Sequence, residues 1–160
     1  MAAKRGRTLR VGDPAPDFRL PLDHGGETSL RELLAGGPVV LAFFKISCPV
    51  CQLTLPFLER LHQAGTLRIF GVSQNSAADT ADFNRAFAVT FPTLLDPETD
   101  FPASNAYGIT NVPTLLLVEP DGVVSWRSDG WYKRDIQALG DRAGVNPFRE
   151  QEYVPEAKAG

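Results

Sequence analysis

The chain has 160 residues, a formal net charge of -3 at pH 7 and 43% hydrophobic residues, values that are ordinary for one globular domain. They exclude a wholly disordered chain, and the slightly acidic balance gives no basic field that would attract nucleic acid. The longest apolar stretch, residues 39–44, is far too short to span a membrane, so we expect neither nucleic acid nor a membrane as a partner.

The first ten residues predict a flexible basic tail. Its charge comes from Lys4, Arg5, Arg7 and Arg10. A secretory signal would need an apolar segment after this charged start, and none follows. We therefore predict a cytoplasmic protein unless an export signal has been removed. The domain itself is expected to span residues 11–144, and residues 145–160 are expected to form a C-terminal polar tail.

The first half of the chain predicts a βαβ unit. After a turn-rich opening, the expected elements are a helix at 29–34, a strand at 39–44, a helix at 50–65 and a strand at 67–72. Residues 39–44 form a continuous apolar run of β-branched and aromatic side chains, which is typical of a strand buried on both faces. Because a strand, a crossover helix and a strand form one unit, the two strands should be parallel.

The second half predicts further strands of the same sheet. The expected elements are a helix at 77–88, a strand at 91–96, a helical turn at 104–107, strands at 114–118 and 123–126, and a helix at 135–143. Turn residues Pro120-Asp121-Gly122 separate the last two strands, so these strands should form an antiparallel hairpin. The predicted fold class is therefore α/β, with a mixed central sheet flanked by helices.

Cys48 and Cys51 are the chain's two cysteines, and their C-x-x-C spacing is the first chemical signal. Cys48 lies at the expected start of a helix, where unsatisfied N–H groups favour the thiolate, and Pro49 suits the first helical position. Such a placement lowers a thiol pKa from about 8.5 to roughly 3.5–7.5. Cys51 follows nearly one turn later and is expected to be shielded. We therefore predict thiol–disulfide exchange with Cys48 as nucleophile and Cys51 as resolving thiol.

Several further segments carry a family resemblance. They are the opening at 11–18, Pro56 five residues after Cys51, the segments 71–73 and 91–94, and the segment 107–117 that contains Pro113. With the C-x-x-C pair, they make residues 11–144 similar to the redoxin branch of the thioredoxin superfamily. That branch includes TlpA-like thiol-disulfide oxidoreductases and the alkyl hydroperoxide reductase and thiol-specific antioxidant family. The resemblance implies a thioredoxin-like fold with a redoxin-type N-terminal extension and insertion.

The resemblance also implies roles for residues outside the C-x-x-C pair. Pro113 should follow a cis peptide bond and face the cysteines, which leaves the Val112 backbone free to pair with a bound substrate strand. Gly130 should form the third wall of the groove, and Trp131 should supply an apolar contact beside it. Pro56 should kink the active-site helix.

The partners expected from this chemistry are thiols and disulfides. They are a disulfide-containing protein or a small thiol as substrate, and a thiol reductant of unidentified structure. We expect a monomer without a cofactor that acts in antioxidant defence and cell redox homeostasis.

The sequence departs from the family pattern around the cysteines. Ala42 stands where many thioredoxins have Asp, Ser47 where they have Trp, and Thr54 where many TlpA-like reductases have Glu. Because that acid accepts the proton of the resolving thiol, its absence leaves the proton acceptor of Cys51 open. The redox potential and the direction of exchange stay open with it.

Two alternatives remain at this stage. A peroxiredoxin-type thiol peroxidase would use Cys51. Arg127 favours it weakly, because it falls near the position from which such enzymes bring an arginine to the thiolate. Their Pro-x-x-x-Thr-x-x-Cys motif, however, would need Pro at Phe44 and Thr at Cys48. A binding module would share zinc or an iron–sulfur cluster between chains. Because His62 lies eleven residues beyond Cys51 on the same helix, ~16 Å away, we predict no metal ligands within one chain.

Overall fold

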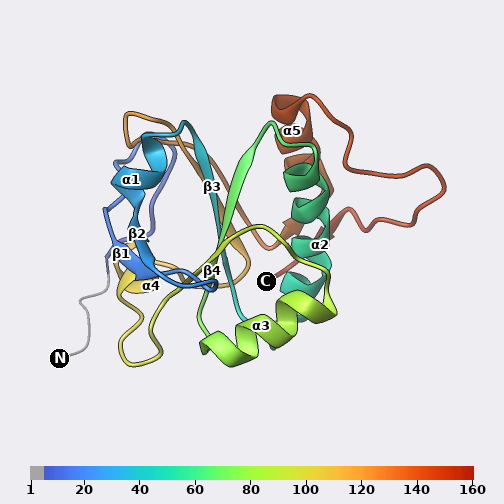
Figure 1. Cartoon of the computed structure of the whole chain (residues 1–160). Helices are drawn as coiled ribbons and strands as arrows, with labels where there is room; N and C mark the ends of the chain where they lie inside the picture. Colours follow the sequence, from blue (N-terminus) through green and yellow to red (C-terminus); the bar gives the residue numbers. More distant parts are fainter. Residues whose placement is uncertain (1–5) are drawn as a thin grey trace.

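The computed structural model describes residues 6–160 and has a mixed sheet at its centre (Figure 1). The sheet order is β5 (Thr93–Leu95), β4 (Arg68–Ser73), β3 (Val39–Phe44), β6 (Thr114–Val118) and β7 (Val124–Asp129). β3 is parallel to β4 and antiparallel to β6, and β6 and β7 form an antiparallel pair. The predicted parallel unit, the hairpin and the mixed-sheet fold class are therefore confirmed.

The central strand β3 divides the protein into two hydrophobic cores. All six of its residues are buried, and successive side chains point to opposite faces, as in any strand. Ala42 and its even-numbered neighbours join the core that contains Leu58 of α2 (Pro49–Gln63). Leu41 and its odd-numbered neighbours join the other core. The continuous apolar run in the sequence is thus explained by burial on both faces.

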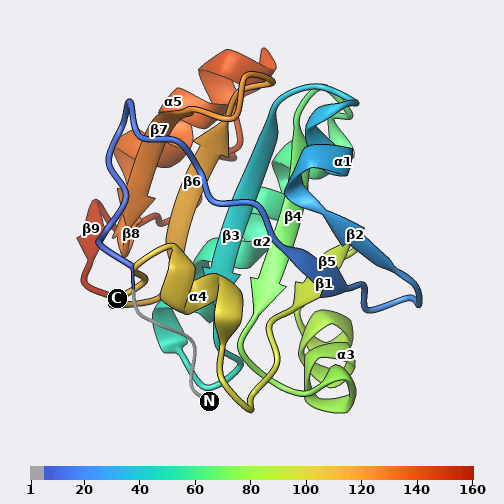
Figure 2. The same cartoon turned by 90° about the vertical axis from the view of Figure 1, so that its left-hand side faces the viewer.

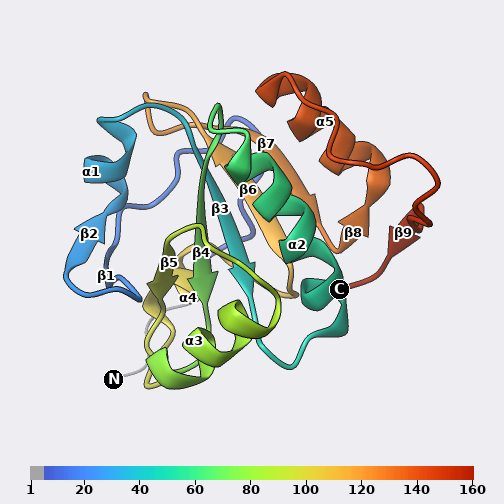
Figure 3. The ribbon, with the colours of Figure 1, turned by 45° about the vertical axis from the view of Figure 1, so that its right-hand side comes forward.

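Helices and short strands cover both faces of the sheet (Figures 1 and 3). One face carries α2, α3 (Ala77–Ala86) and α5 (Lys133–Ala143). The other carries the hairpin of β1 (Arg19–Pro21) and β2 (Glu27–Ser29), together with α1 (Leu30–Leu34) and α4 (Pro102–Ala106). No helix within residues 6–160 has the length and apolar character needed to cross a bilayer.

Several element boundaries differ from the predictions by one to three residues, and the structure gives a reason for two of them. α3 ends at Ala86 rather than at residue 88, because Ala88 adopts the left-handed backbone region (φ 55°). β7 continues to Asp129, because Asp129 still pairs with Thr114 across the hairpin. These pairings were not visible in the local pattern of the sequence.

The N-terminal segment is packed where the structure describes it. Leu9 is buried, and the backbone N–H of Gly6 donates a hydrogen bond of 2.6 Å to the carbonyl of Asn105. The prediction of a flexible tail over residues 1–10 is therefore wrong for residues 6–10. Lys4 and Arg5 lie outside the described residues.

The C-terminal segment is also packed against the domain, which corrects the expectation of a polar tail. Val154 is buried, and Arg60 of α2 holds Glu152 through two hydrogen bonds of 2.9 and 2.6 Å. The segment then returns as β9 (Ala157–Lys158), which pairs antiparallel with β8 (Trp131–Tyr132) (Figure 2). Too few apolar side chains take part for the sequence pattern to reveal this packing.

Candidate active site

Cys48 caps the N-terminus of α2, as predicted. Its backbone is extended (φ -88°, ψ 112°), and its Sγ accepts a hydrogen bond of 3.1 Å from the backbone N–H of Cys51. Pro49 occupies the first helical turn, where its missing N–H removes no helical hydrogen bond. Cys48 is half-buried and Cys51 is fully buried, so the two thiols differ in access. The arrangement gives one sulfur that meets solvent and one shielded sulfur directly behind it.

The loop that presents Cys48 is held by side chains that the sequence did not single out. The amide of Gln52 donates to the carbonyl of Ile46 at 3.0 Å, and Oδ1 of Asn75 accepts from the Ile46 backbone N–H at 3.0 Å. The backbone N–H of Cys48 donates to the carbonyl of Lys45 at 3.3 Å. Asn75 follows β4 and is distant in sequence, so only the tertiary structure could identify it.

Burial strongly raises the pKa of the Cys51 thiol above its ordinary value of 9.0. Its hydrogen bond with Cys48 raises the pKa further, and the backbone and charge of Lys45 lower it in part. Thr54 stands at the position where the resemblance implied a Glu, and its hydroxyl donates to the Val50 carbonyl at 2.7 Å. Burial therefore favours the protonated thiol of Cys51 at neutral pH. Thr54 is not an acid and so does not supply the proton acceptor that a Glu would supply at this position.

The predicted substrate-binding backbone lies against Cys48. The Val112–Pro113 peptide bond is cis, and the Cys48 thiol donates to the Val112 carbonyl at 3.4 Å. The backbone N–H of Gly130 donates to the Pro113 carbonyl at 2.8 Å. The structure thus brings Val112, Pro113 and Gly130 together beside the half-buried sulfur, although 64 residues separate Cys48 from Val112.

Trp131 was predicted to line the groove beside Cys48, but the structure places it elsewhere. Its side chain is 0% exposed, packs 4.9 Å from the ring of Phe57 between centroids, and donates from Nε1 to the Pro155 carbonyl at 2.6 Å. The C-terminal segment therefore covers the indole. The prediction that Trp131 supplies an apolar contact to substrate is therefore wrong, since the indole is covered by residues 154–158, whose packing the local sequence did not indicate.

Pro56 lies inside α2, at the position that the resemblance indicated. It has no N–H to donate to the carbonyl of Gln52, one turn earlier. The helix nevertheless continues to Gln63. This proline therefore interrupts the backbone hydrogen bonds of the helix without ending it.

The side chains around the cysteines do not support the peroxidase alternative. Arg127 lies on β7, pairs in register with Leu116, and is bound to Asp129 at 3.2 Å. It is thus two strands away from β3, and it does not face Cys51. Within residues 6–160, no group of three His, Cys, Asp or Glu side chains is placed to hold a metal ion.

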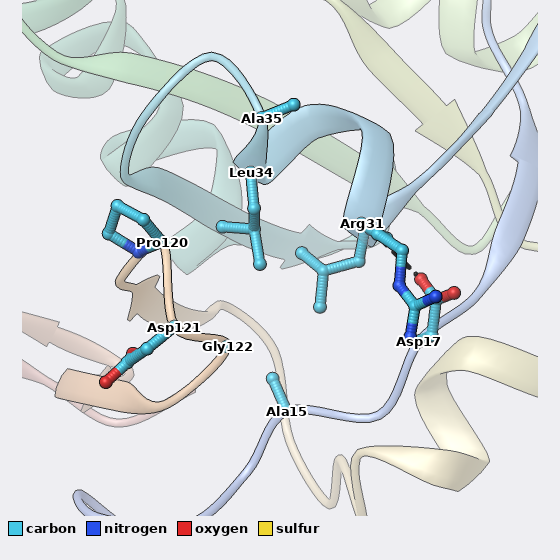
Figure 4. Close-up of a pocket in the computed structure, with 9 residues that line it drawn as sticks. Ala15, Asp17, Arg31, Leu34, Ala35, Pro120, Asp121 and Gly122 are labelled. Carbon is cyan, nitrogen blue, oxygen red and sulfur yellow. Dashed lines mark hydrogen bonds between the residues drawn. The ribbon is translucent and has the colours of Figure 1, made fainter.

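A hollow of about 340 Å³ lies at the opposite end of the sheet (Figure 4). It is bounded by α1 and by the hairpin turn at Pro120–Gly122. This turn lies near the start of β3, because Val118, just before the turn, pairs with Val39, the first residue of β3. The backbone N–H of Arg31 there donates to Asp17 at 3.1 Å, shown as a dashed line in Figure 4. Because Cys48 follows the other end of β3, this hollow is remote from the sulfurs.

Comparisons with known proteins agree with this geometry. The model of the AhpC/TSA family matches residues 11–127. The thioredoxin-like protein YneN of Bacillus subtilis is 31% identical over 129 residues, which cover 76% of this chain and 73% of that protein. The thiol-disulfide oxidoreductase ResA of Geobacillus thermodenitrificans is 30% identical over 120 residues, which cover 72% of this chain and 67% of that protein.

Solved structures show the same fold. The thioredoxin domain of a thiol-disulfide oxidoreductase from Bacteroides vulgatus superimposes with a TM-score of 0.74 at 22% identity, covering 87% of this chain and 100% of that chain. The peroxidoxin BcpB of Mycobacterium tuberculosis has a TM-score of 0.68 at 23% identity, covering 84% and 94%. The predicted thioredoxin-like fold is therefore confirmed.

Proposed function

Because the chain belongs to the AhpC/TSA family and places a cysteine pair at the start of α2, we propose that it exchanges disulfides through Cys48 and Cys51. Its similarity to proteins named thiol-disulfide oxidoreductases supports this reaction class. The observation that carries the proposal is the difference in access between the two sulfurs. Cys48 is half-buried and contacts the Val112 carbonyl, whereas Cys51 is fully buried behind it.

The reaction proceeds in two exchanges. The Cys48 thiolate attacks one sulfur of a substrate disulfide, a mixed disulfide forms, and the other substrate sulfur leaves as a thiolate that takes up a proton. Cys51 then loses its proton and attacks Cys48 Sγ, which forms the Cys48–Cys51 disulfide and releases the second substrate thiol. Two electrons pass from the protein dithiol to the substrate. A thiol reductant reverses the process on the protein, and the same pair run backwards oxidises a dithiol.

The chain contributes position and protection to this reaction. The amides at the start of α2 stabilise negative charge on Cys48, since a helix N-terminus attracts anions. Burial raises the pKa of Cys51, so this thiol is mostly protonated at neutral pH and the first attack falls to Cys48. Val112, whose carbonyl accepts from the Cys48 thiol, and the adjoining Pro113 lie beside the sulfur that substrate has to reach.

The test uses the protein's own pair of cysteines. Cys51→Ser leaves Cys48 as the single thiol, so incubation with hydroxyethyl disulfide should give a stable mixed disulfide on Cys48, identified by peptide mass spectrometry. Cys48→Ser should give none, because Cys51 is fully buried. Ser47→Ala, a change of an exposed neighbour, serves as the control and should retain exchange. Modification of Cys51 in place of Cys48 would contradict the proposal.

The peroxidase alternative gives the opposite result in the same variants. It requires rapid consumption of peroxide that needs Cys51 and survives Cys48→Ser. Full burial of Cys51 counts against it, as does the register pairing of Arg127 with Leu116, which belongs to the core on the other face of the sheet from Cys51. The cytoplasmic location stays a prediction, which cell fractionation tests.

A further inference from the structure

The substrate groove of this protein is open on one side of Cys48 and covered on the other. The cover is the strap, defined here as residues 147–160. Its last residues lie on the two backbone walls of the groove: a Cβ added to Gly130 would meet the Lys158 carbonyl at 2.8 Å and the Gly160 nitrogen at 3.1 Å. A Cβ added to Gly160 would overlap the Val112 carbonyl. An extended polypeptide that paired with Val112 would need this same space.

The strap is held in place by contacts along its length. Arg60 donates to the Pro147 carbonyl at 2.8 Å and to Glu152, and Val154 is buried. The Trp131 indole donates to the Pro155 carbonyl, and the backbone N–H of Lys133 donates to the Glu156 carbonyl at 3.0 Å. β9 then completes a two-stranded sheet with β8. The edge of β8, which follows Gly130, is thus already paired by a strand of the protein itself.

The open side is a hollow of about 220 Å³ that begins at Val112. Neither cysteine lines the hollow, but Val112 connects the two, because its carbonyl accepts the hydrogen bond from Cys48. Its walls combine polar side chains, including Gln74, Ser104 and Asn111, with the apolar side chains of Phe101 and Ile109. Among the described residues that line it, Lys45 is the only charged side chain. The volume of this hollow is below the range that is typical of sites for drug-sized ligands.

We propose that the strap excludes extended polypeptides from the Val112–Gly130 edge, and that substrate enters beside Lys45 as a small disulfide that carries a carboxylate. This inference rests on the proposed exchange reaction and names its substrate class. The carboxylate half of the disulfide occupies the hollow and faces Lys45, while its sulfur meets Cys48. The reaction is the two-electron exchange described above, with two small thiols as products.

The charge part of the proposal is tested with three small disulfides of similar size. Pre-reduced full-length protein reacts in single turnover with dithiodipropionate, a dicarboxylate, with neutral hydroxyethyl disulfide and with cationic cystamine. The dicarboxylate should react fastest and cystamine slowest. Lys45→Gln should lower the ratio of dicarboxylate to neutral rates about two- to fivefold, the range of one exposed ion pair. Arg31→Gln, at the other end of the sheet, is the matched control and should leave this ratio unchanged.

The strap part is tested with a peptide whose two cysteines are joined by a disulfide in an extended, unstructured chain. Val154→Asp places a charge at a buried position and should release the strap. Tyr153→Asp, the matched control, places the same charge at a position that is 89% exposed. Release should raise the peptide rate relative to hydroxyethyl disulfide about tenfold, the effect of losing one buried valine. Tyr153→Asp should match the wild type.

Tryptophan fluorescence reports whether the strap has moved. Trp131 is fully buried against the strap, so its emission should shift to longer wavelength in Val154→Asp. If Val154→Asp fails to fold, Glu152→Gln removes the charge that faces Arg60 and should raise the peptide ratio about two- to fivefold.

Two results would overturn the inference. One is an equal rate for the three small disulfides in the wild type; the other is an unchanged peptide ratio although Trp131 emission shows release. Failure of the proposed function looks different, because hydroxyethyl disulfide would then not react through Cys48 at all.

Discussion

Attack by Cys51 should become faster with pH throughout the neutral and mildly alkaline range. Burial, and then the hydrogen bond with Cys48, hold the Cys51 pKa well above its ordinary value of 9.0. At pH 7 less than about one thiol in a hundred is therefore ionised, and each pH unit raises that fraction about tenfold. Since the thiolate is the attacking form, the rate of resolution should rise by about the same factor between pH 7 and pH 9, with no plateau.

Ellman's reagent separates the two exchanges. Attack by Cys48 releases one thionitrobenzoate, and resolution by Cys51 releases a second, so stopped-flow absorbance should show two phases. Cys51→Ser should retain the first phase and lose the second, which assigns the phases. A second phase whose rate levels off below about pH 8 would refute the reasoning, because it would mean that Cys51 ionises easily despite its burial.

Three further predictions concern stability. The Arg60 ion pair lowers the Glu152 pKa from 4.5 to about 2, so its contribution is present above the ordinary value and is lost as the pH falls toward about 2. Glu152→Gln should reduce the free energy of unfolding by about 1 kcal/mol at pH 7, measured in urea titrations. The difference from the wild type should shrink below about pH 5. A difference of the same size at pH 2 would contradict this prediction. Leu41→Ala, at a position with no exposed area, should cost about 2–5 kcal/mol in the same titrations, and a loss below about 1 kcal/mol would show that the core is not closely packed there. Asp96 is fully buried and accepts hydrogen bonds from the backbone N–H groups of Ala103 at 2.9 Å and Ser104 at 2.8 Å. Asp96→Ala should therefore lower the thermal midpoint and reduce the free energy of unfolding by about 1–3 kcal/mol. Asp96→Asn, which keeps one acceptor oxygen, should cost less.

The sequence by itself determined the features that depend on neighbouring residues. The apolar run of β3 had to be a strand covered on both faces, and the C-x-x-C spacing had to place Cys48 at the start of α2 with Cys51 one turn behind it. These follow from backbone periodicity and from the chemistry of helix ends, which act over a few residues. The resemblance supplied the cis bond before Pro113, which the structure contains.

Only the tertiary structure decided what surrounds the sulfurs. Asn75 holds the loop before Cys48 from the end of β4, and the strap covers Trp131 and reaches Val112 and Gly130. These contacts join segments that are far apart along the chain, and they are made largely by backbone groups, which every residue carries alike. A pattern of side chains cannot report such pairings. Which side of the reactive sulfur is open was therefore settled by the folding of the chain back on itself.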